Sequence, residues 1–446
     1  MLDYFHAVYV DQNRCNGCTR CLRVCPTQAM RIRHGKANIL ENKCIDCGEC
    51  IRVCPQKAIS AKVDTLEIIS AYKHKLLVYS PVFFGQFKKT DNVKKILGIF
   101  KLLGFDDIIG VDTGGMIISD IIKNFLKDKK NIYRPYISTN CPAVVRLIQV
   151  KFPSLINHLV PLRNLMDVAG EYLKHVYQEK TGASDDEIGL FYLSPCPAKV
   201  VAIYQPEAEE KRIFDGVFSL GDMYNEIRRI MEKQDFSEMD MEEEIVSSKF
   251  ALRWSALGDV ENKFNESVTL RIDGIQNAIR FLERLENGEI KDIDFIDMYS
   301  CDNSCVGGVF TKEDAFISEY RIKKIAEGLP DEPSLVLPFD RDEICSIGMP
   351  LKPRPISPLD EDIKEALKKM KKIEEVNRLL PQLNCGMCGC PTCYDLAEDI
   401  IIGKDVTIYD CPVILKERLR KLSKDIVQMA GHVNPIENDN EGFSPI

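Results

Sequence analysis

Cysteine is the residue type that best indicates the chemistry of this 446-residue chain, because eight of its 18 cysteines lie between residues 15 and 54. The segments CNGCTRCLRVCP and CIDCGECIRVCP share one pattern, C-x2-C-x2-C-x3-C-P, 29 residues apart. This spacing is typical of domains that bind two four-iron clusters, in which the fourth cysteine of each run binds the other run's cluster. We therefore expect two 4Fe–4S clusters here, with zinc as the alternative. The first would be held by Cys15, Cys18, Cys21 and Cys54, and the second by Cys44, Cys47, Cys50 and Cys25.

The remaining composition favours a cytoplasmic electron carrier that is sensitive to oxygen. No export signal or long apolar run is visible, and thiols without an export signal are more often metal ligands than disulfides. The net charge of −9 gives no basic surface for nucleic acid, and no membrane insertion is expected. Two neighbouring clusters would pass single electrons between an external carrier and a deeper site.

Four further cysteines are widely spaced between residues 141 and 305. Cys141, Cys196 and Cys301 each follow the end of an apolar segment that we expect to be a strand, and Cys305 comes four residues after Cys301. Ligands collect at the carboxyl ends of strands in open α/β sheets, so these thiols could converge on one site. The alternative is four unrelated buried cysteines. Pro142 suits the first turn of a helix whose dipole would favour an anionic ligand at Cys141.

Alternating apolar strands and amphipathic helices must position these cysteines. Strands are expected at 75–80, 107–112, 136–139, 188–194 and 295–300, with helices after Asn92, ending near Gly104, and after Ser219. This order predicts an α/β domain with a largely parallel sheet. Asp112-Thr113-Gly114-Gly115 follows a strand, but no complete nucleotide-binding motif is present. Electrons from a nicotinamide would therefore require a separate flavin-bearing subunit.

The central segments STNCPAVV, SPCPAK and CDNSCVGG resemble the three cysteine motifs of the iron-only hydrogenases, over roughly residues 75–350. The resemblance implies that Cys141, Cys196 and Cys301 bind a cubane that Cys305 bridges to a two-iron subcluster. It also implies that Lys199 contacts a cyanide ligand of that subcluster, the alternative being an ordinary surface lysine.

Four positions depart from the family pattern. Asn140 stands where a proton-donating cysteine is usual, and an amide cannot relay a proton as a thiol can. Tyr299 replaces a methionine, Ser304 replaces a glycine, and Val309 interrupts a glycine run. These changes resemble branches of the family that sense hydrogen or act within larger complexes, which implies slow turnover.

A third cysteine group closes the chain. LNCGMCGCPTC followed by DCP gives C-x2-C-x4-C-x17-C through Cys385, Cys388, Cys393 and Cys411, resembling the small four-iron domain of corrinoid iron–sulfur proteins. We expect one more 4Fe–4S cluster here, with structural zinc as the alternative. Cys390 and Cys345 are off the pattern and are predicted to be spare thiols.

The predicted fold is a multidomain α/β protein. Its parts are a dicluster ferredoxin domain at 1–64, an iron-hydrogenase-like domain at 74–349, a proline-rich linker and helix at 350–379, a C-terminal cluster domain at 380–415, and a helix with a disordered tail at 416–446. The acidic run at 236–246 is interpreted as a solvated surface.

The leading functional hypothesis is a hydrogenase-like oxidoreductase that uses Lys199, Cys305 and Asn140 at its site, for slow hydrogen chemistry or for sensing. The alternatives are an electron-transfer or regulatory subunit without the two-iron centre, and an iron–sulfur assembly factor. The expected partner is a ferredoxin or a flavin-bearing redox subunit, with a sensor or kinase protein as a further candidate.

Overall fold

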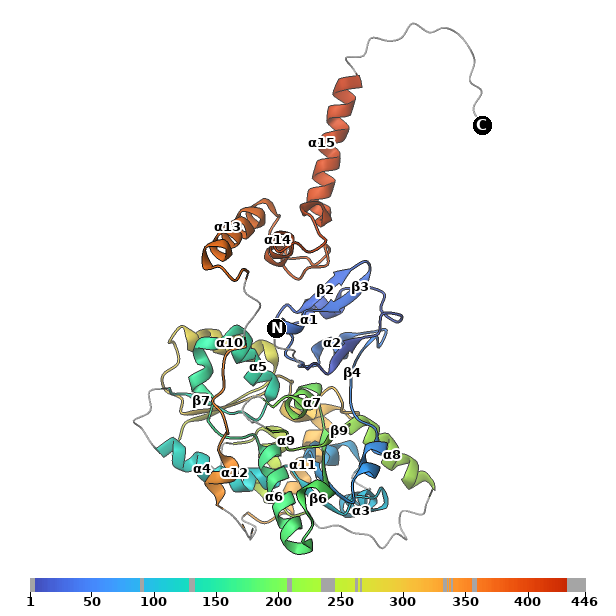
Figure 1. Ribbon diagram of the computed structural model, residues 1–446, viewed down its shortest axis with the longest axis vertical. Coiled ribbons are helices and arrows are strands. Elements are labelled where there is room, and N and C mark those ends of the chain that lie inside the picture. Colours follow the sequence, from blue (N-terminus) through green and yellow to red (C-terminus); the bar gives the residue numbers. More distant parts are fainter. Residues whose placement is uncertain are drawn as a thin grey trace. The chain divides into compact units, whose positions relative to one another are not determined.

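The architecture is seen in a computed structural model of the chain (Figure 1). It describes residues 5–88, 92–127, 133–206, 211–233, 245–260, 264, 267–331, 335, 337, 340–354 and 359–430. The chain divides into two compact units. The first contains residues 1–16, 24–29 and 39–356, and the second contains residues 17–23, 30–38 and 357–446. The β2–β3 hairpin of the dicluster segment therefore belongs mainly with the C-terminal module.

The dicluster segment has the short elements of a ferredoxin. Strands β1 (Val8–Val10) and β4 (Ile59–Ala61) pair antiparallel, and β2 (Met30–Arg33) pairs with β3 (Lys36–Ile39). Two five-residue helices, α1 (Arg20–Val24) and α2 (Glu49–Val53), follow the first cysteines of each run. The repeated cysteine pattern thus corresponds to a repeated local structure, with one short helix in each run.

The central domain contains two parallel sheets. One has the order β6-β5-β8-β9 and the other β10-β11-β7. The bounds of the first are β5 His74–Tyr79, β6 Asp107–Gly110, β8 Ile188–Ser194 and β9 Gly216–Ser219. Those of the second are β7 Tyr136–Ile137, β10 Thr269–Ile272 and β11 Phe295–Met298. Every residue of β8 is buried, as expected for a strand covered on both faces.

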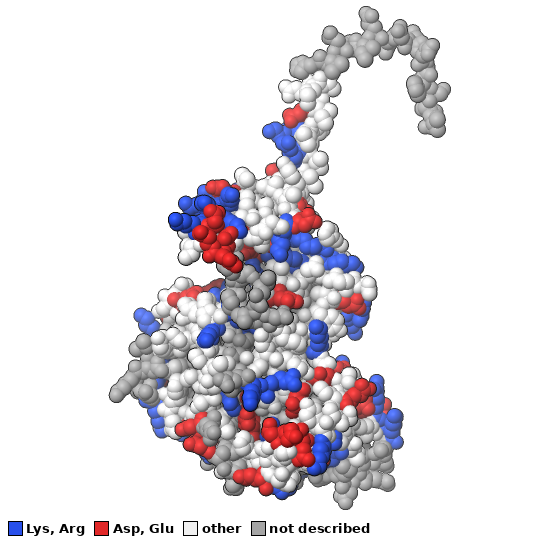
Figure 2. Space-filling view, viewed as in Figure 1, with Lys and Arg blue, Asp and Glu red and all other residues white. Residues whose placement is uncertain are grey.

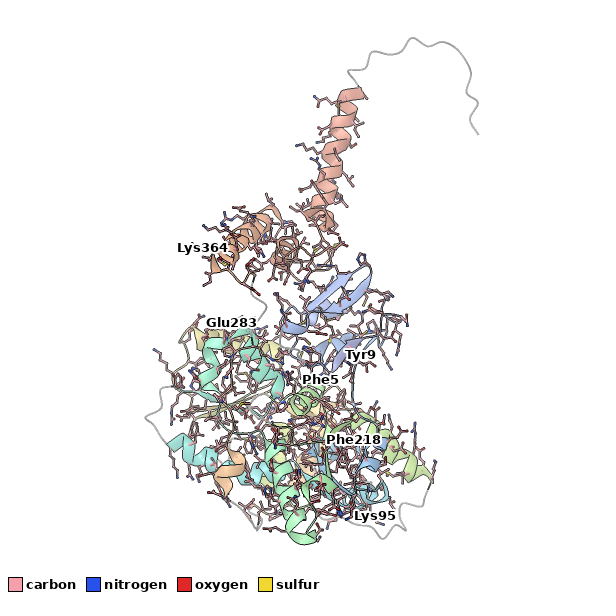
Figure 3. All side chains as sticks on the ribbon, viewed as in Figure 1. Phe5, Tyr9, Lys95, Phe218, Glu283 and Lys364 are labelled. Carbon is pink, nitrogen blue, oxygen red and sulfur yellow. The ribbon has the colours of Figure 1, made fainter. Side chains whose placement is uncertain are left out.

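Helices cover both sheets. They are α3 Val93–Leu102, α4 Asp112–Lys127, α5 Pro142–Lys151, α6 Leu165–Thr181, α7 Pro197–Tyr204, α8 Leu220–Lys233, α9 Lys249–Leu257, α10 Ile275–Glu286, α11 Ala315–Glu327 and α12 Arg341–Cys345. Phe218 of β9 lies among the densely packed side chains of this domain (Figure 3).

The predicted α/β class and the parallel pairing of its strands are confirmed, and the strands divide into two sheets. The strand expected at 107–112 ends at Gly110, and Asp112 already begins α4. The helix expected before Gly104 ends at Leu102, and Gly104 follows with a positive φ of 99°. The acidic run lies almost entirely outside the described residues, as do 355–358 of the linker and the tail after Ala430.

The C-terminal module is helical. Its helices are α13 (Ile363–Leu379), α14 (Cys393–Ile401) and α15 (Pro412–Ala430). The helix expected within 350–379 is present as α13, and Ile373 is its one buried residue. Among the described residues, none of the helices is both long and apolar enough to cross a membrane.

Candidate functional site

The four central cysteines lie where the two parallel sheets end. Cys141 is the N-cap of α5 after β7, Cys196 is the N-cap of α7 after β8, and Cys301 follows β11. Cys305 lies in the 3-10 turn η6 (Ser304–Gly307). Strands from both sheets therefore contribute ligands, which explains how residues 164 positions apart can serve one site.

Hydrogen bonds and charges show that these thiols are neighbours. The Ser300 hydroxyl lies 3.6 Å from the Cys141 sulfur and 3.9 Å from the Cys301 sulfur. Burial raises the pKa of the Cys301 thiol well above its ordinary value, and Cys196, Cys141 and Cys305 raise it further. Metal coordination offsets such a penalty, because a cation stabilises thiolates. The donor set therefore fits a metal cluster.

Lys199 is buried among the thiols. It is 8% exposed, and its Nζ donates to the backbone oxygen of Asn140 at 3.2 Å. Burial alone would lower the pKa of Lys199, but nearby Tyr192 and Cys305 outweigh this and hold the pKa above its ordinary value. The side chain is a fixed positive charge, which excludes the surface-lysine interpretation.

Tyr192 adds an unused donor beside this charge. Its hydroxyl is fully buried and has no hydrogen-bond partner among the described residues. Burial raises the pKa of Tyr192. The charge of Lys199 lowers this pKa, and that of Cys305 raises it. A buried orphan donor is costly unless a ligand accepts from it, so this feature also fits a site built for a bound group.

Asp297 is a buried carboxylate behind the site that the sequence analysis missed. It accepts hydrogen bonds from Trp254 Nε1 at 2.8 Å, the Tyr299 hydroxyl at 2.7 Å, Asn140 Nδ2 at 3.4 Å and the Ser138 hydroxyl. The two departures Asn140 and Tyr299 therefore share one acceptor. An acidic residue inside the apolar segment FIDMYS was the available signal.

The other two departures from the family pattern, Ser304 and Val309, also make specific contacts. Ser304 has a positive φ of 56°, which a side chain rarely adopts, and its hydroxyl lies 2.9 Å from the Leu257 carbonyl oxygen and 2.6 Å from an Asp273 carboxylate oxygen. Val309 lies against Gly48, where an added Cβ would approach the valine to 2.8 Å.

The second ferredoxin run contacts this site within the first unit. The Arg52 guanidinium donates to the Gly307 backbone oxygen at 2.6 Å, and Cys47 belongs to the same apolar core as Cys141 and Cys196. The dicluster repeat is visible in hydrogen bonds too: Ala29 N donates to Cys25 Sγ at 3.2 Å and Ala58 N donates to Cys54 Sγ at 3.3 Å. Such bonds stabilise the more negative, reduced state of a cluster.

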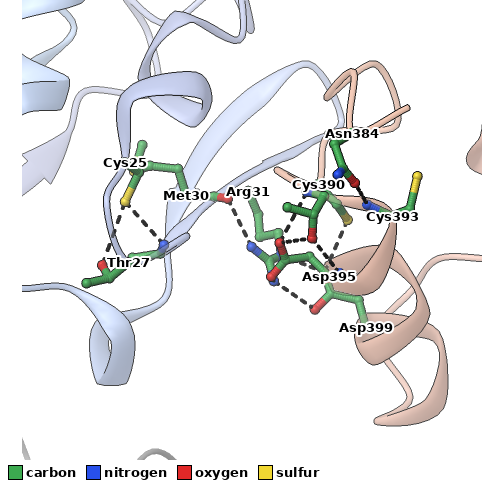
Figure 4. A network of polar contacts seen from close by, with 12 residues as sticks. Cys25, Thr27, Met30, Arg31, Asn384, Cys390, Cys393, Asp395 and Asp399 are labelled. Carbon is green, nitrogen blue, oxygen red and sulfur yellow. Dashed lines mark hydrogen bonds and ion pairs between the residues drawn. The ribbon is translucent and has the colours of Figure 1, made fainter. Parts of the chain in front are cut away.

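In the second unit, two arginines of the β2–β3 hairpin bind carboxylates of α14, and one of them, Arg33, also contacts the C-terminal cysteine loop (Figure 4). Arg31 Nε donates to Asp399 at 2.8 Å and its Nη2 donates to Asp395 at 3.0 Å. Arg33 Nη2 donates to Asp399 at 2.5 Å and to Cys390 Sγ at 3.1 Å. Cys390 is thus held by protein groups.

The second unit brings four of the five C-terminal cysteines together. Cys390, Cys393 and Cys411 are buried in one core, with Cys388 packed against it. A hydrogen bond from Cys390 lowers the pKa of the Cys388 thiol to about 6, with Arg33 also contributing. Gly386 and Gly389, with φ of 73° and 79°, allow the loop to turn beside these thiols. A low thiol pKa suits metal ligation.

Exchange of Cys390 for alanine should leave the C-terminal cluster bound, because the Cys390 sulfur is already hydrogen-bonded to Arg33 and Cys388. Exchange of Cys393 for alanine should remove roughly four irons per chain. Iron analysis of the two variants, purified without oxygen, gives the comparison. Equal loss from both variants would make Cys390 a ligand.

Asp112 contrasts with Asp297, because neither of its buried carboxylate oxygens has a hydrogen-bond partner among the described residues. Burial raises the pKa of Asp112 to about 6, a shift that the nearby Ser247 opposes. The folded state therefore binds this proton more tightly than the unfolded state, and stability falls as the pH rises from about 4 to above 6.

Exchange of Asp112 for asparagine should remove this penalty. At pH 8 the variant should gain up to about 3 kcal/mol of unfolding free energy, since each pKa unit is worth about 1.4 kcal/mol. At pH 4 the gain should vanish. Thermal unfolding at both pH values measures it, and a gain that does not depend on pH would contradict the assignment.

Comparisons with known proteins agree with this arrangement. Residues 73–257 match the family described as "Iron only hydrogenase large subunit, C-terminal domain". Residues 7–55 match "4Fe-4S dicluster domain" and residues 380–413 match "Putative Fe-S cluster". The chain is thus an iron–sulfur protein with a ferredoxin-type dicluster domain, a central domain of the iron-only hydrogenase type and a C-terminal iron–sulfur region.

The relationship to individual proteins is distant. Iron hydrogenase 1 of Clostridium pasteurianum is 25% identical over 263 residues, which cover 49% of this chain and 45% of that protein. An uncharacterized protein of Methanocaldococcus jannaschii is 36% identical over 72 residues, covering 16% of this chain and 32% of that protein. The chain thus matches less than half the length of either relative.

A solved FeFe-hydrogenase structure, reported for stepwise H-cluster assembly, has a TM-score of 0.51 at 14% identity. The superposed region covers 65% of this chain and 98% of the hydrogenase chain. This likeness establishes the fold of the central domain.

Proposed function

We propose that the protein is a hydrogenase-like oxidoreductase that acts slowly, in hydrogen sensing or within a larger redox complex. Cys141, Cys196 and Cys301 would hold a cubane, and Cys305 would bridge it to a two-iron group. The observation that carries this proposal is the convergence of four thiols, three of which lie close to the buried cation Lys199. When bound, such a group supplies the reversible splitting of hydrogen into protons and electrons.

Lys199 would anchor an anionic ligand of that group. Its Nζ is fixed on the Asn140 carbonyl oxygen, so its position does not depend on the ligand. The N-terminal turn of α7 adds to this electrostatic support, because backbone N–H groups of Ala198 and Lys199 bond to the Cys196 sulfur and lower its pKa against the raising effect of burial. A preorganised charge of this kind needs no rearrangement on binding.

Slow turnover is supported by the surroundings of Asn140. Its amide donates to Asp297 and carries no ionisable proton, while Tyr299 donates to the same carboxylate. Burial raises the pKa of Tyr299 well above its ordinary value, so this hydroxyl also holds its proton. Neither side chain is a good general acid near neutral pH.

Electrons would enter and leave through the ferredoxin segment. Within the first unit, Gly48 contacts Val309 and Arg52 binds the Gly307 carbonyl oxygen, so the loop of the second cluster reaches the central site directly. The C-terminal cluster would be a further electron-transfer site within the second unit, beside the hairpin that carries Arg31 and Arg33. A ferredoxin or a flavin-bearing subunit is the expected partner, with a sensor or kinase protein as the receiver in a sensing role.

The second candidate is an electron-transfer or regulatory subunit that holds the cubane alone. Asn140 favours it, because the usual proton donor is missing. The buried Lys199 and the unpartnered Tyr192 hydroxyl weigh against it, because a cubane with four protein ligands has no use for either group.

Reduction by hydrogen separates the two candidates. The full chain, matured without oxygen by hydrogenase assembly proteins, is placed under hydrogen and its reduced clusters are measured by electron paramagnetic resonance. We expect reduction of the wild type by hydrogen, and reduction of Cys305→Ser only by a chemical reductant. If hydrogen reduces neither protein although both accept electrons chemically, the electron-transfer candidate is correct.

A further inference from the structure

Helix α15 carries an apolar stripe that no part of the described chain covers. None of its 19 residues is buried. The stripe consists of Leu415, Leu419, Leu422, Ile426 and Met429, which are 40–63% exposed. In Figure 3 most of α15 extends beyond the other helices of the second unit, and Figure 2 shows that much of the visible helix surface is uncharged. Five large apolar side chains in water need a partner surface.

The spacing along this stripe identifies the kind of partner. Successive apolar residues are separated by 4, 3, 4 and 3 positions. This is the heptad pattern of two helices wound around each other, with Leu419 and Ile426 at a positions and Leu415, Leu422 and Met429 at d positions. A helix that packs on a globular core usually has a broader apolar face. The stripe therefore fits a second helix with the same pattern.

We propose that α15 forms an antiparallel two-helix coiled coil with α15 of a second copy of this chain, making the protein a homodimer. Antiparallel pairing with complete overlap places Leu419 opposite Leu422 of the second copy and Leu415 opposite Ile426 of the second copy. Pro412 then lies opposite Met429 of the second copy. Every position of the stripe meets an apolar side chain along the whole helix, which is about 28 Å long at 1.5 Å per residue.

Charge selects this orientation over the parallel one. Arg418 and Asp425 occupy g positions beside the stripe. In the antiparallel pair each Arg418 meets Asp425 of the second copy, giving two symmetric ion pairs. In a parallel pair Arg418 would meet Ser423 of the second copy, and Asp425 would meet Ala430 of the second copy, so neither charge would gain a partner. Flanking charges of this kind set the orientation of coiled coils.

Sedimentation velocity of the full, cluster-loaded chain without oxygen tests the dimer. We expect a dimer at micromolar concentrations for the wild type and a monomer for Leu419→Lys, since each introduced lysine would be buried in the apolar seam opposite Leu422 of the second copy. Lys421→Ala, on the opposite side of the helix, is the matched control and should remain dimeric. Iron content and circular dichroism confirm that all three proteins are folded. A monomeric wild type, or a dimeric Leu419→Lys, overturns the proposal.

A charge exchange tests the orientation separately. Arg418→Asp should raise the dissociation constant several-fold, because it places two like charges together. The double variant Arg418→Asp/Asp425→Arg should restore the wild-type constant, because the pairs are only reversed. If Arg418→Asp weakens nothing while Leu419→Lys gives monomers, the helices are not antiparallel and that part of the proposal is overturned.

Discussion

Exchange of Asn140 for cysteine should raise the rate of hydrogen turnover by roughly 10² to 10⁴-fold, which is the usual contribution of a positioned general acid. Asn140 is 7% exposed, next to Cys141, and its carbonyl oxygen is held by Lys199. A thiol there would be fixed beside the reacting group, and its ordinary pKa of about 8.5 suits proton transfer near neutral pH. Hydrogen-dependent dye reduction by the matured protein measures the effect.

Asn140→Ser is the matched control, because a hydroxyl of similar size cannot donate a proton at neutral pH as a thiol can. It should remain as slow as the wild type. If Asn140→Cys is equally slow although its clusters are complete, the missing thiol is not what limits turnover, and the role given to position 140 is wrong.

Exchange of Asp399 for alanine should destabilise the C-terminal module by about 3 kcal/mol, the lower end of the usual cost of breaking a buried ion pair, because Asp395 still pairs with Arg31. Asp399 accepts from Arg31 and Arg33, and Arg31 is only 2% exposed. Loss of the carboxylate also removes one acceptor of the Cys390 thiol, which lies at 3.5 Å. Hydrogen exchange of the α14 amides in the full chain reports the stability of this module.

Asp405→Ala, on the exposed loop after α14, is the control and should change stability by less than about 0.5 kcal/mol. Equal protection of α14 in Asp399→Ala and the wild type would mean that the hairpin does not stabilise this module.

The positions of the central cysteines could be predicted because they depend on local signals. Apolar segments that end before Cys196 and Cys301 place both residues at carboxyl ends of parallel strands. The division into two sheets could not be predicted, because strand pairing depends on contacts distant in sequence: β7 pairs with β11, about 160 residues later. A strand pattern specifies a strand but not its neighbour.

Side-chain partners were missed for the same reason. Asp297 binds Asn140 across 157 residues and Trp254 across 43, and Arg31 binds Asp399 across 368. No spacing rule connects residues so far apart. Buried charges inside apolar segments indicate that partners exist, because an unpaired buried charge is costly, but they do not identify them.

The ligand assignments for the clusters and the roles of Lys199 and Asn140 stay predictions, as do the partners. The most direct measurement of the central claim is the infrared spectrum of the anaerobically matured protein in the carbonyl and cyanide region, since no protein group absorbs as those ligands do. The account predicts bands that shift under hydrogen and that are lost in Cys305→Ser. A spectrum without such bands, from protein with a full complement of four-iron clusters, would contradict it.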